Sequence, residues 1–133
     1  MKAYTPEELG RIAVSLRGWR WMRGMSALEN DENRELMVWG PCGEAVYEDA
    51  NGCPEFTMIE GSDLPDPTDP ATAGCLLQLL GAGASWLQMT TWAPDCARAT
   101  PTAWRVGNVG PLDLGSACII AAKIIECWPG GDH

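Results

Sequence analysis

The sequence predicts an α+β fold: an antiparallel sheet of four to five strands packed with three helices, in the order α-β-β-α-β-β-α. Three segments repeat apolar residues at helical spacing, and short runs of strand-forming residues bounded by turn signals lie between them. Helices separated by antiparallel hairpins are typical of a sheet covered by helices on at least one face. The length of 133 residues fits one domain spanning 1–133, with an acidic, loop-rich segment at about 40–68.

The first predicted helix covers roughly residues 6–17. Thr5 is a suitable N-cap, Pro6 suits the first helical position, and Glu8 completes a capping box. The apolar residues that follow repeat at i, i+3, i+4 and i+7, which places them on one helical face. Gly18 is placed to end the helix.

Strands are expected between the first and second helices. Residues 19–28 read as a strand with two tryptophans on one face, and 35–39 as a second strand that a Gly-Pro pair ends. Shorter strands fit 45–47 and, after an Asn-Gly turn signal, 56–59. The rest of this region is expected to be loop.

The second helix is predicted at roughly 70–80. Asp69 is its cap and Pro70 its first residue, while Gly81 and Gly83 are placed to stop it. Strands at 85–92 and 102–106 are then expected to pair. A third helix follows, from near Asp113 to about Cys127.

The third helix is apolar nearly all round. Ile119, Ile120 and Ala122 lie off its main apolar stripe, and its long charged side chains are only Lys123 and Glu126. A helix of this kind is buried on more than one side. In a chain this small we expect the second side to be a subunit interface, most simply that of a homodimer.

Acidic residues are concentrated in the middle of the chain. The net charge is −9, and residues 29–69 hold twelve acids and one base. Direct binding of duplex nucleic acid is not expected, because phosphate binding needs a basic face. The acidic segment reads either as a solvated, solubilising stretch or as a surface that binds a basic partner or imitates nucleic acid. No apolar run approaches the ~18 residues that span a bilayer, so no membrane partner is expected.

The chain carries six cysteines and one histidine, His133. Three cysteines fall in apolar helical patterns, the N-terminus lacks a signal-peptide core, and no Cys-x-x-Cys pair occurs. We therefore expect reduced thiols and no metal. A catalytic Ser-His or Cys-His pair is not expected, since a chain-end histidine is hard to hold in place. The sequence thus predicts a non-enzymatic protein with no catalytic residues and no cofactor.

One cluster of residues has the chemistry of a ligand site: Trp19, Arg20, Trp21 and Arg23. Arginine forks pair with phosphates, and indole faces stack on bases. The cluster therefore predicts binding of a small nucleotide. The alternative is that the tryptophans are core residues and the arginines offset the acidic segment.

Two stretches resemble a known group of proteins. They are Gly18-Trp19-Arg20-Trp21-Met22 with Gly24-Met25, and the run from Leu64-Pro65-Asp66-Pro67 to Gly74-Cys75-Leu76-Leu77. Together with the C-terminal apolar helix, they resemble small uncharacterised proteins of tailed bacteriophages and prophages, of the phage ABA sandwich domain type. The resemblance implies an α/β sandwich and a viral accessory protein in the host cytoplasm. It supplies no catalytic residues.

These observations favour binding over catalysis. The leading hypothesis is a non-enzymatic phage accessory protein that inhibits a host anti-phage defence process, either by sequestering a nucleotide signal or by binding a host protein. Two alternatives remain: a structural or assembly protein of the virion, and a small hydrolase that relies on Asp or Glu alone.

Overall fold

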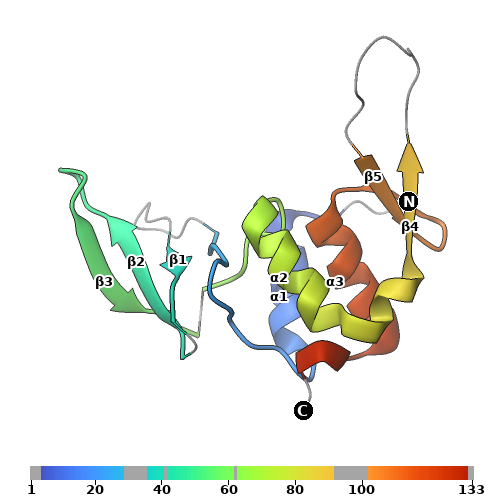
Figure 1. Cartoon of the computed structure of the whole chain (residues 1–133), viewed down its shortest axis with the longest axis horizontal. Helices are drawn as coiled ribbons and strands as arrows, with labels where there is room; N and C mark the ends of the chain where they lie inside the picture. Colours follow the sequence, from blue (N-terminus) through green and yellow to red (C-terminus); the bar gives the residue numbers. More distant parts are fainter. Residues whose placement is uncertain (1–3, 29–35, 41, 62, 92–101, 132–133) are drawn as a thin grey trace, which may run out of the picture.

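The computed structural model describes residues 4–28, 36–40, 42–61, 63–91 and 102–131. Three α-helices form one body. Strands within residues 37–58 form the first three-stranded sheet, which projects from one side of that body, and strands within 87–112 form the second three-stranded sheet, which lies on the opposite side (Figure 1). The predicted α+β class is confirmed. The prediction of one sheet of four to five strands is wrong, because the described strands form two separate antiparallel sheets.

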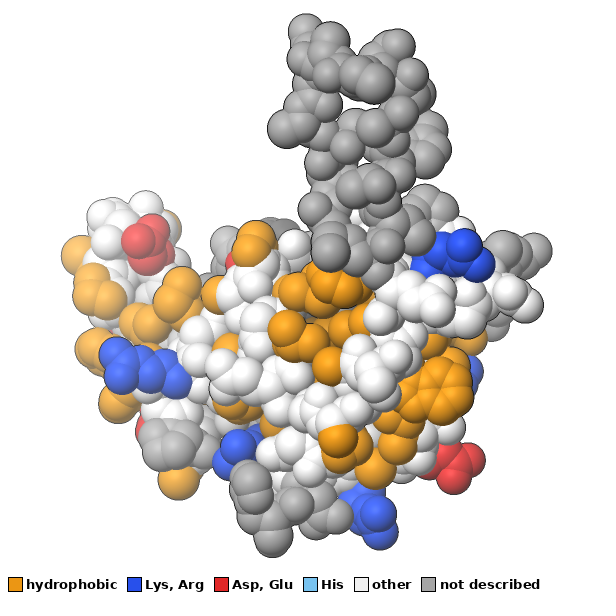
Figure 2. All heavy atoms as spheres, turned by 45° about the vertical axis from the view of Figure 1, so that its right-hand side comes forward, with side chains coloured by type: hydrophobic (Ala, Val, Ile, Leu, Met, Phe, Trp, Pro, Cys, Tyr) orange, Lys and Arg blue, Asp and Glu red, His pale blue; other side chains and the backbone are white. Residues whose placement is uncertain are grey.

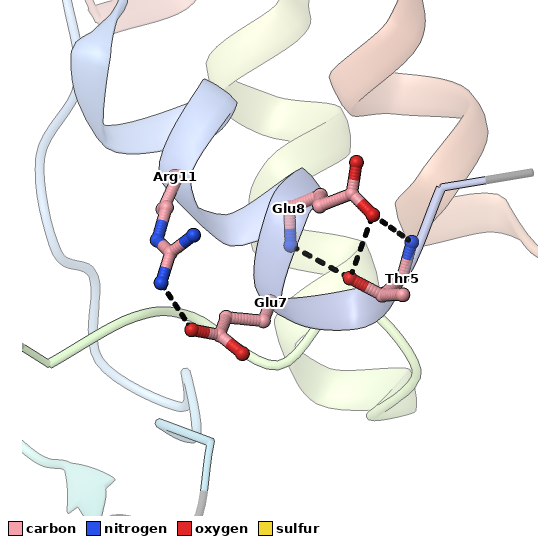
Figure 3. Close-up of polar contacts among 4 residues, drawn as sticks. All are labelled: Thr5, Glu7, Glu8 and Arg11. Atoms are coloured by element: carbon pink, nitrogen blue, oxygen red, sulfur yellow. Dashed lines mark hydrogen bonds and ion pairs between the residues drawn. The ribbon is translucent and has the colours of Figure 1, made fainter.

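Helix α1 (Pro6–Ser15) begins with the predicted capping box. The Thr5 hydroxyl oxygen accepts a hydrogen bond from the Glu8 N–H at 3.1 Å, and the Glu8 carboxylate accepts one from the Thr5 N–H at 3.5 Å (Figure 3). On the exposed side of the helix, Arg11 forms an ion pair with Glu7, one turn earlier (Figure 3). The helix ends two residues before the predicted boundary.

Helix α2 (Pro70–Leu80) has the predicted bounds. The Asp69 carboxylate accepts hydrogen bonds from the N–H and the hydroxyl of Thr72, both at 2.9 Å. Gly81 adopts φ 53° at the helix end, and a 3-10 helix, η1 (Gly81–Trp86), follows directly. That 3-10 helix occupies the start of the predicted strand at 85–92, so the strand begins later than expected.

Helix α3 (Leu114–Ile125) is capped by Asp113, which accepts a hydrogen bond from the Ser116 hydroxyl at 2.6 Å. All residues from 115 to 122 are buried within the single chain. The helix packs against α1, α2 and the second sheet. The apolar residues that suggested a subunit interface, Ile119, Ile120 and Ala122, are therefore covered by the chain itself.

The second sheet consists of β4 (Leu87–Thr91), β5 (Thr102–Val106) and β6 (Val109–Leu112), in that order. The β4–β5 pairing is the expected hairpin of strands. Strand β6 was not expected from the sequence. It returns from β5 through a turn at Gly107, where φ is 59°.

The first sheet consists of β1 (Met37–Val38), β2 (Glu44–Glu48) and β3 (Pro54–Met58), in that order. The turn between β2 and β3 is held by the Asp49 carboxylate, which accepts hydrogen bonds from the Asn51 N–H at 2.8 Å and the Cys53 N–H at 2.9 Å. An Asp side chain that bonds to backbone two residues later favours such a turn.

The prediction of a strand at 19–28 is wrong for the described residues. Residues 19–22 belong to no helix or strand, the chain turns at 23–24, and Ser26 and Ala27 make only isolated bridges. Gly24 adopts φ 100° in that turn, a conformation that favours glycine. The tryptophans of this segment pack on the helical core and are not part of a sheet.

Trp128, three residues after the end of α3, connects α3 with α1. Its side chain is fully buried, and its indole N–H donates to the Ala13 carbonyl of α1 at 2.9 Å. Its backbone N–H donates to the Arg17 carbonyl at 2.7 Å. A Cβ on Gly18 would lie 2.5 Å from the Trp128 carbonyl oxygen, so only glycine permits this close approach of the two segments.

Candidate functional site

The predicted ligand residues Trp19, Arg20, Trp21 and Arg23 lie between α1 and the first sheet. The rings of Trp19 and Trp21 meet edge to face, with centroids 5.5 Å apart and planes at 76°. Trp19 also contacts the buried Trp128 ring, with centroids 6.0 Å apart. Both tryptophans are half-buried against the main core, so packing accounts for their positions.

The two arginines are exposed. Within the described part of the chain, neither forms an ion pair or a cation–π contact. The structure thus brings Trp19 and Trp21 together but does not bring Arg20 or Arg23 against their rings.

A different surface has the properties of a binding site. In the first sheet, Met37 is opposite Val46, and Val46 is opposite Phe56. Residues directly opposite one another lie on the same side of a sheet, as do alternate residues of one strand. Trp39 and Met58 therefore share this side, and we call the side formed by these five residues the outer face.

Large apolar side chains on the outer face are exposed to solvent. The exposed fractions are 53% for Met37, 46% for Trp39, 70% for Phe56 and 51% for Met58. The Trp39 and Phe56 rings meet edge to face with centroids 6.1 Å apart, so the apolar residues are contiguous across the strands. Contiguous exposed apolar surface on a small protein marks interaction sites.

The opposite side of the first sheet attaches it to the rest of the molecule. Ala45 is fully buried in a small cluster with Ala27 and Leu36, against which Trp21 and Ile59 pack. Trp21 and Ile59 also contact the main core, so they join the two clusters. The inner side is occupied in this way, whereas the large side chains of the outer face remain exposed.

The segment that forms the first sheet and its turns carries charged side chains of one sign. Residues 36–61 contain five acids and no lysine or arginine. Glu48 lies on the same side as the apolar residues and is exposed, and Glu55 and Glu60 are exposed in and after β3. Space-filling atoms show acidic and apolar side chains close together on this part of the molecule (Figure 2, left). The surface is therefore an apolar patch with acidic surroundings.

Sequence reasoning missed the outer face because it placed strands at 35–39, 45–47 and 56–59 without assigning which of their sides is exposed. The signal was nevertheless present: Phe56 and Met58 alternate with Glu55 and Thr57 in a segment whose other residues are polar or acidic. Which side of such a strand is exposed can be recognised only when the strands that pair with it are known.

The buried thiols of Cys75 and Cys118 have low reactivity. Burial, with a smaller contribution from the nearby Asp113 charge, raises the pKa of the Cys118 thiol to about 12. Burial also raises the pKa of Cys75, with Asp69 adding to the shift. Because the thiolate is the reactive form, these groups are unsuited to act as nucleophiles. The five described cysteines are free, and Cys96 lies outside the described residues.

Two further properties concern only the part of the chain that the structure describes. No group of three or more His, Cys, Asp or Glu residues there is arranged to hold a metal ion. No helix there is long and apolar enough to cross a membrane.

Comparisons with protein-family models, with curated proteins and with solved structures give no match to this chain.

Proposed function

We propose that this chain is a non-enzymatic binding protein whose outer face docks a partner protein. One observation carries the proposal: four large apolar side chains, each about half exposed or more, share one side of a small sheet. Fully burying one apolar side chain of this size stabilises a protein or complex by roughly 1.5–3 kcal/mol, and these side chains do not gain that free energy while they face water. A partner that covers them recovers part of this free energy.

The chemistry of the partner follows from the charge. Five acids and no base in residues 36–61 favour a protein surface that combines apolar side chains with lysine or arginine. A second copy of this chain fits less well, because the two net charges of −9 would repel each other. A nucleotide phosphate would be repelled in the same way.

The resemblance of the sequence to phage proteins supports a bacterial host protein as the partner. Binding of that kind would inhibit a host anti-phage defence process in the host cytoplasm. Sequestration of a nucleotide signal has less support, since the arginines do not converge on the Trp19–Trp21 pair.

The proposal is tested by comparing surface variants that differ only in location. Phe56→Ser with Met58→Ser removes two exposed apolar side chains from the outer face. Trp86→Ser removes a side chain of similar exposure, 48%, from the 3-10 helix beside the helical body. Each tagged protein is used to capture proteins from a bacterial lysate, and any captured protein is purified and titrated against all three by calorimetry.

We expect a captured protein whose affinity falls at least tenfold for the double variant and is unchanged for Trp86→Ser. Capture alone does not support the proposal. The proposal is overturned if the captured protein binds the wild type and the double variant with equal affinity. It is also overturned if the captured protein is acidic and its affinity is the same for all variants, or if the wild-type chain captures nothing. Self-association abolished by the double variant would make a second copy the occupant instead.

A further inference from the structure

The first sheet has one covered edge and one open edge. Beside β1, the Gly24 N–H donates to the Val38 carbonyl at 2.9 Å, and the Val38 N–H donates to the Met25 carbonyl at 2.8 Å. Strand β3 pairs with β2 on one side and has no strand on its other side among the described residues. It lies at the far end of the molecule, away from the helices (Figure 1).

Hydrogen bonds at both ends of the β2–β3 pair fix which backbone groups face the open edge. The Ile59 N–H donates to the Gly43 carbonyl at 2.8 Å, and the Asp49 N–H donates to the Cys53 carbonyl at 2.9 Å. In an antiparallel pair, hydrogen-bonded and non-hydrogen-bonded positions alternate. Counting from these two bonds, Glu55 and Thr57 bond to β2, and their neighbours in β3 direct N–H and C=O groups outward.

The outward positions are Pro54, Phe56 and Met58. Proline has no N–H to offer, and an open edge is where a strand tolerates it. Phe56 and Met58 each direct an N–H and a C=O to the edge, where no described strand pairs with them. Their side chains, on the outer face, are 70% and 51% exposed. The same two residues therefore offer both backbone hydrogen bonds and apolar contact.

This edge is little protected. Sheet edges are commonly blocked by lysine, by bulges, by very short strands or by a covering segment. Strand β3 has five residues in unbroken register with β2 and contains no lysine. Pro54 blocks only its first position, and the exposed Glu55 supplies a negative charge beside it.

We propose that the partner binds by strand addition, in which an extended segment carrying lysine or arginine pairs with the open edge of β3. This inference rests on the proposed function and specifies how the outer face is used. The added strand would bond to the outward backbone groups of Phe56 and Met58. Its alternate side chains would extend the outer face, and basic side chains would lie near Glu55 and Glu60.

The test uses a ten-residue peptide that alternates lysine with valine, and a matched peptide that alternates glutamate with valine. Met58→Pro and Met58→Ala both remove the Met58 side chain, but only the proline also removes the outward N–H. Because that N–H does not bond to β2, both variants keep the β2–β3 ladder. Circular dichroism checks that both are folded.

We expect the lysine peptide to bind the wild type and the glutamate peptide not to bind. Met58→Ala should weaken binding by less than tenfold, and Met58→Pro should weaken it at least tenfold more. Equal weakening by the two variants would overturn strand addition while leaving the outer face as a docking surface. Equal binding of the wild type and Phe56→Ser would instead overturn the proposed function.

Amide hydrogen exchange in the wild type gives a second readout that needs no variant. In the free protein, we expect fast exchange at Phe56 and Met58 and slower exchange at Glu55 and Thr57. Saturating lysine peptide should protect Phe56 and Met58. If both amides exchange equally fast with and without bound peptide, strand addition is wrong even if Met58→Pro fails to fold.

Discussion

Replacing Trp128 by phenylalanine tests the role that the structure gives to the tryptophans. Trp128 is fully buried, contacts the ring of Trp19, and donates its indole N–H to the Ala13 carbonyl at 2.9 Å. Phenylalanine keeps an aromatic ring but lacks the N–H and the full volume of the indole. We expect Trp128→Phe to lower the free energy of unfolding.

The size of the loss follows from two contributions. The Ala13 carbonyl would lose the indole N–H and keep its longer hydrogen bond from the Leu16 N–H, at 3.4 Å. A buried acceptor that loses a hydrogen-bond donor lowers the free energy of unfolding by about 1–3 kcal/mol. Phenylalanine leaves roughly 40 Å³ of the indole volume empty, which at about 24 cal/mol per Å³ adds about 1 kcal/mol. The expected total is about 2–4 kcal/mol, or a fall in Tm of roughly 8–16 °C for a domain of this size.

Urea unfolding followed by far-ultraviolet circular dichroism measures the loss. Trp86→Phe is the matched control, because the same substitution is made at a side chain that is 48% exposed. A surface change of this kind stays within about 0.5 kcal/mol. The reasoning is refuted if Trp128→Phe costs less than the control, or if the two variants cost the same.

Three further outcomes are expected. Gly115→Ala should lower the free energy of unfolding by about 3 kcal/mol, since its Cβ would lie 1.9 Å from a backbone carbonyl oxygen. Gly74→Ala should raise it by about 0.5–1 kcal/mol, because Gly74 lies on α2 with open space around it. Thermal melts compare the two variants. In the native protein, a thiol reagent should modify the exposed Cys42 and Cys53 quickly and the buried Cys118 only on unfolding, which peptide mass mapping resolves. The pKa of Cys118 is raised from 9.0 to about 12, so its contribution to stability should be complete below pH 9 and decline between pH 9 and 12. Urea midpoints that fall equally over this range for the wild type and Cys118→Ala would contradict it.

Helix boundaries could be predicted because they depend on neighbouring residues. Asp69-Pro70 and the Thr5–Glu8 capping box place the starts of α2 and α1 by local hydrogen bonds, and the structure contains both. Strand pairing depends on residues far apart in the chain. The sequence therefore did not show that the strands divide into two sheets. It also did not show that the tryptophans of 19–28 pack on the core while 24–27 bonds to β1 and its neighbours without forming a regular strand.

The sequence identified tryptophans and arginines at 19–23 whose side-chain types suit a nucleotide, but it did not give the directions in which those side chains point. Tryptophan and arginine in alternation are compatible with a nucleotide site, yet the side toward which each points depends on packing against the end of the chain. For the outer face, the alternation of Phe56 and Met58 was visible in the sequence. Its exposure depends on which side of the sheet meets Ala27 and Leu36, which no local pattern specifies.

The measurement that tests the central claim most directly is a map of backbone amide shifts on titration of the wild-type protein with the lysine–valine peptide. We predict that the perturbed amides cluster at 37–39, 44–48 and 55–59, along the outer face and the β3 edge, and that 19–23 is little affected. Perturbations centred on 19–23, or shifts of equal size with the glutamate–valine peptide, would contradict the assignment of the first sheet as the binding surface.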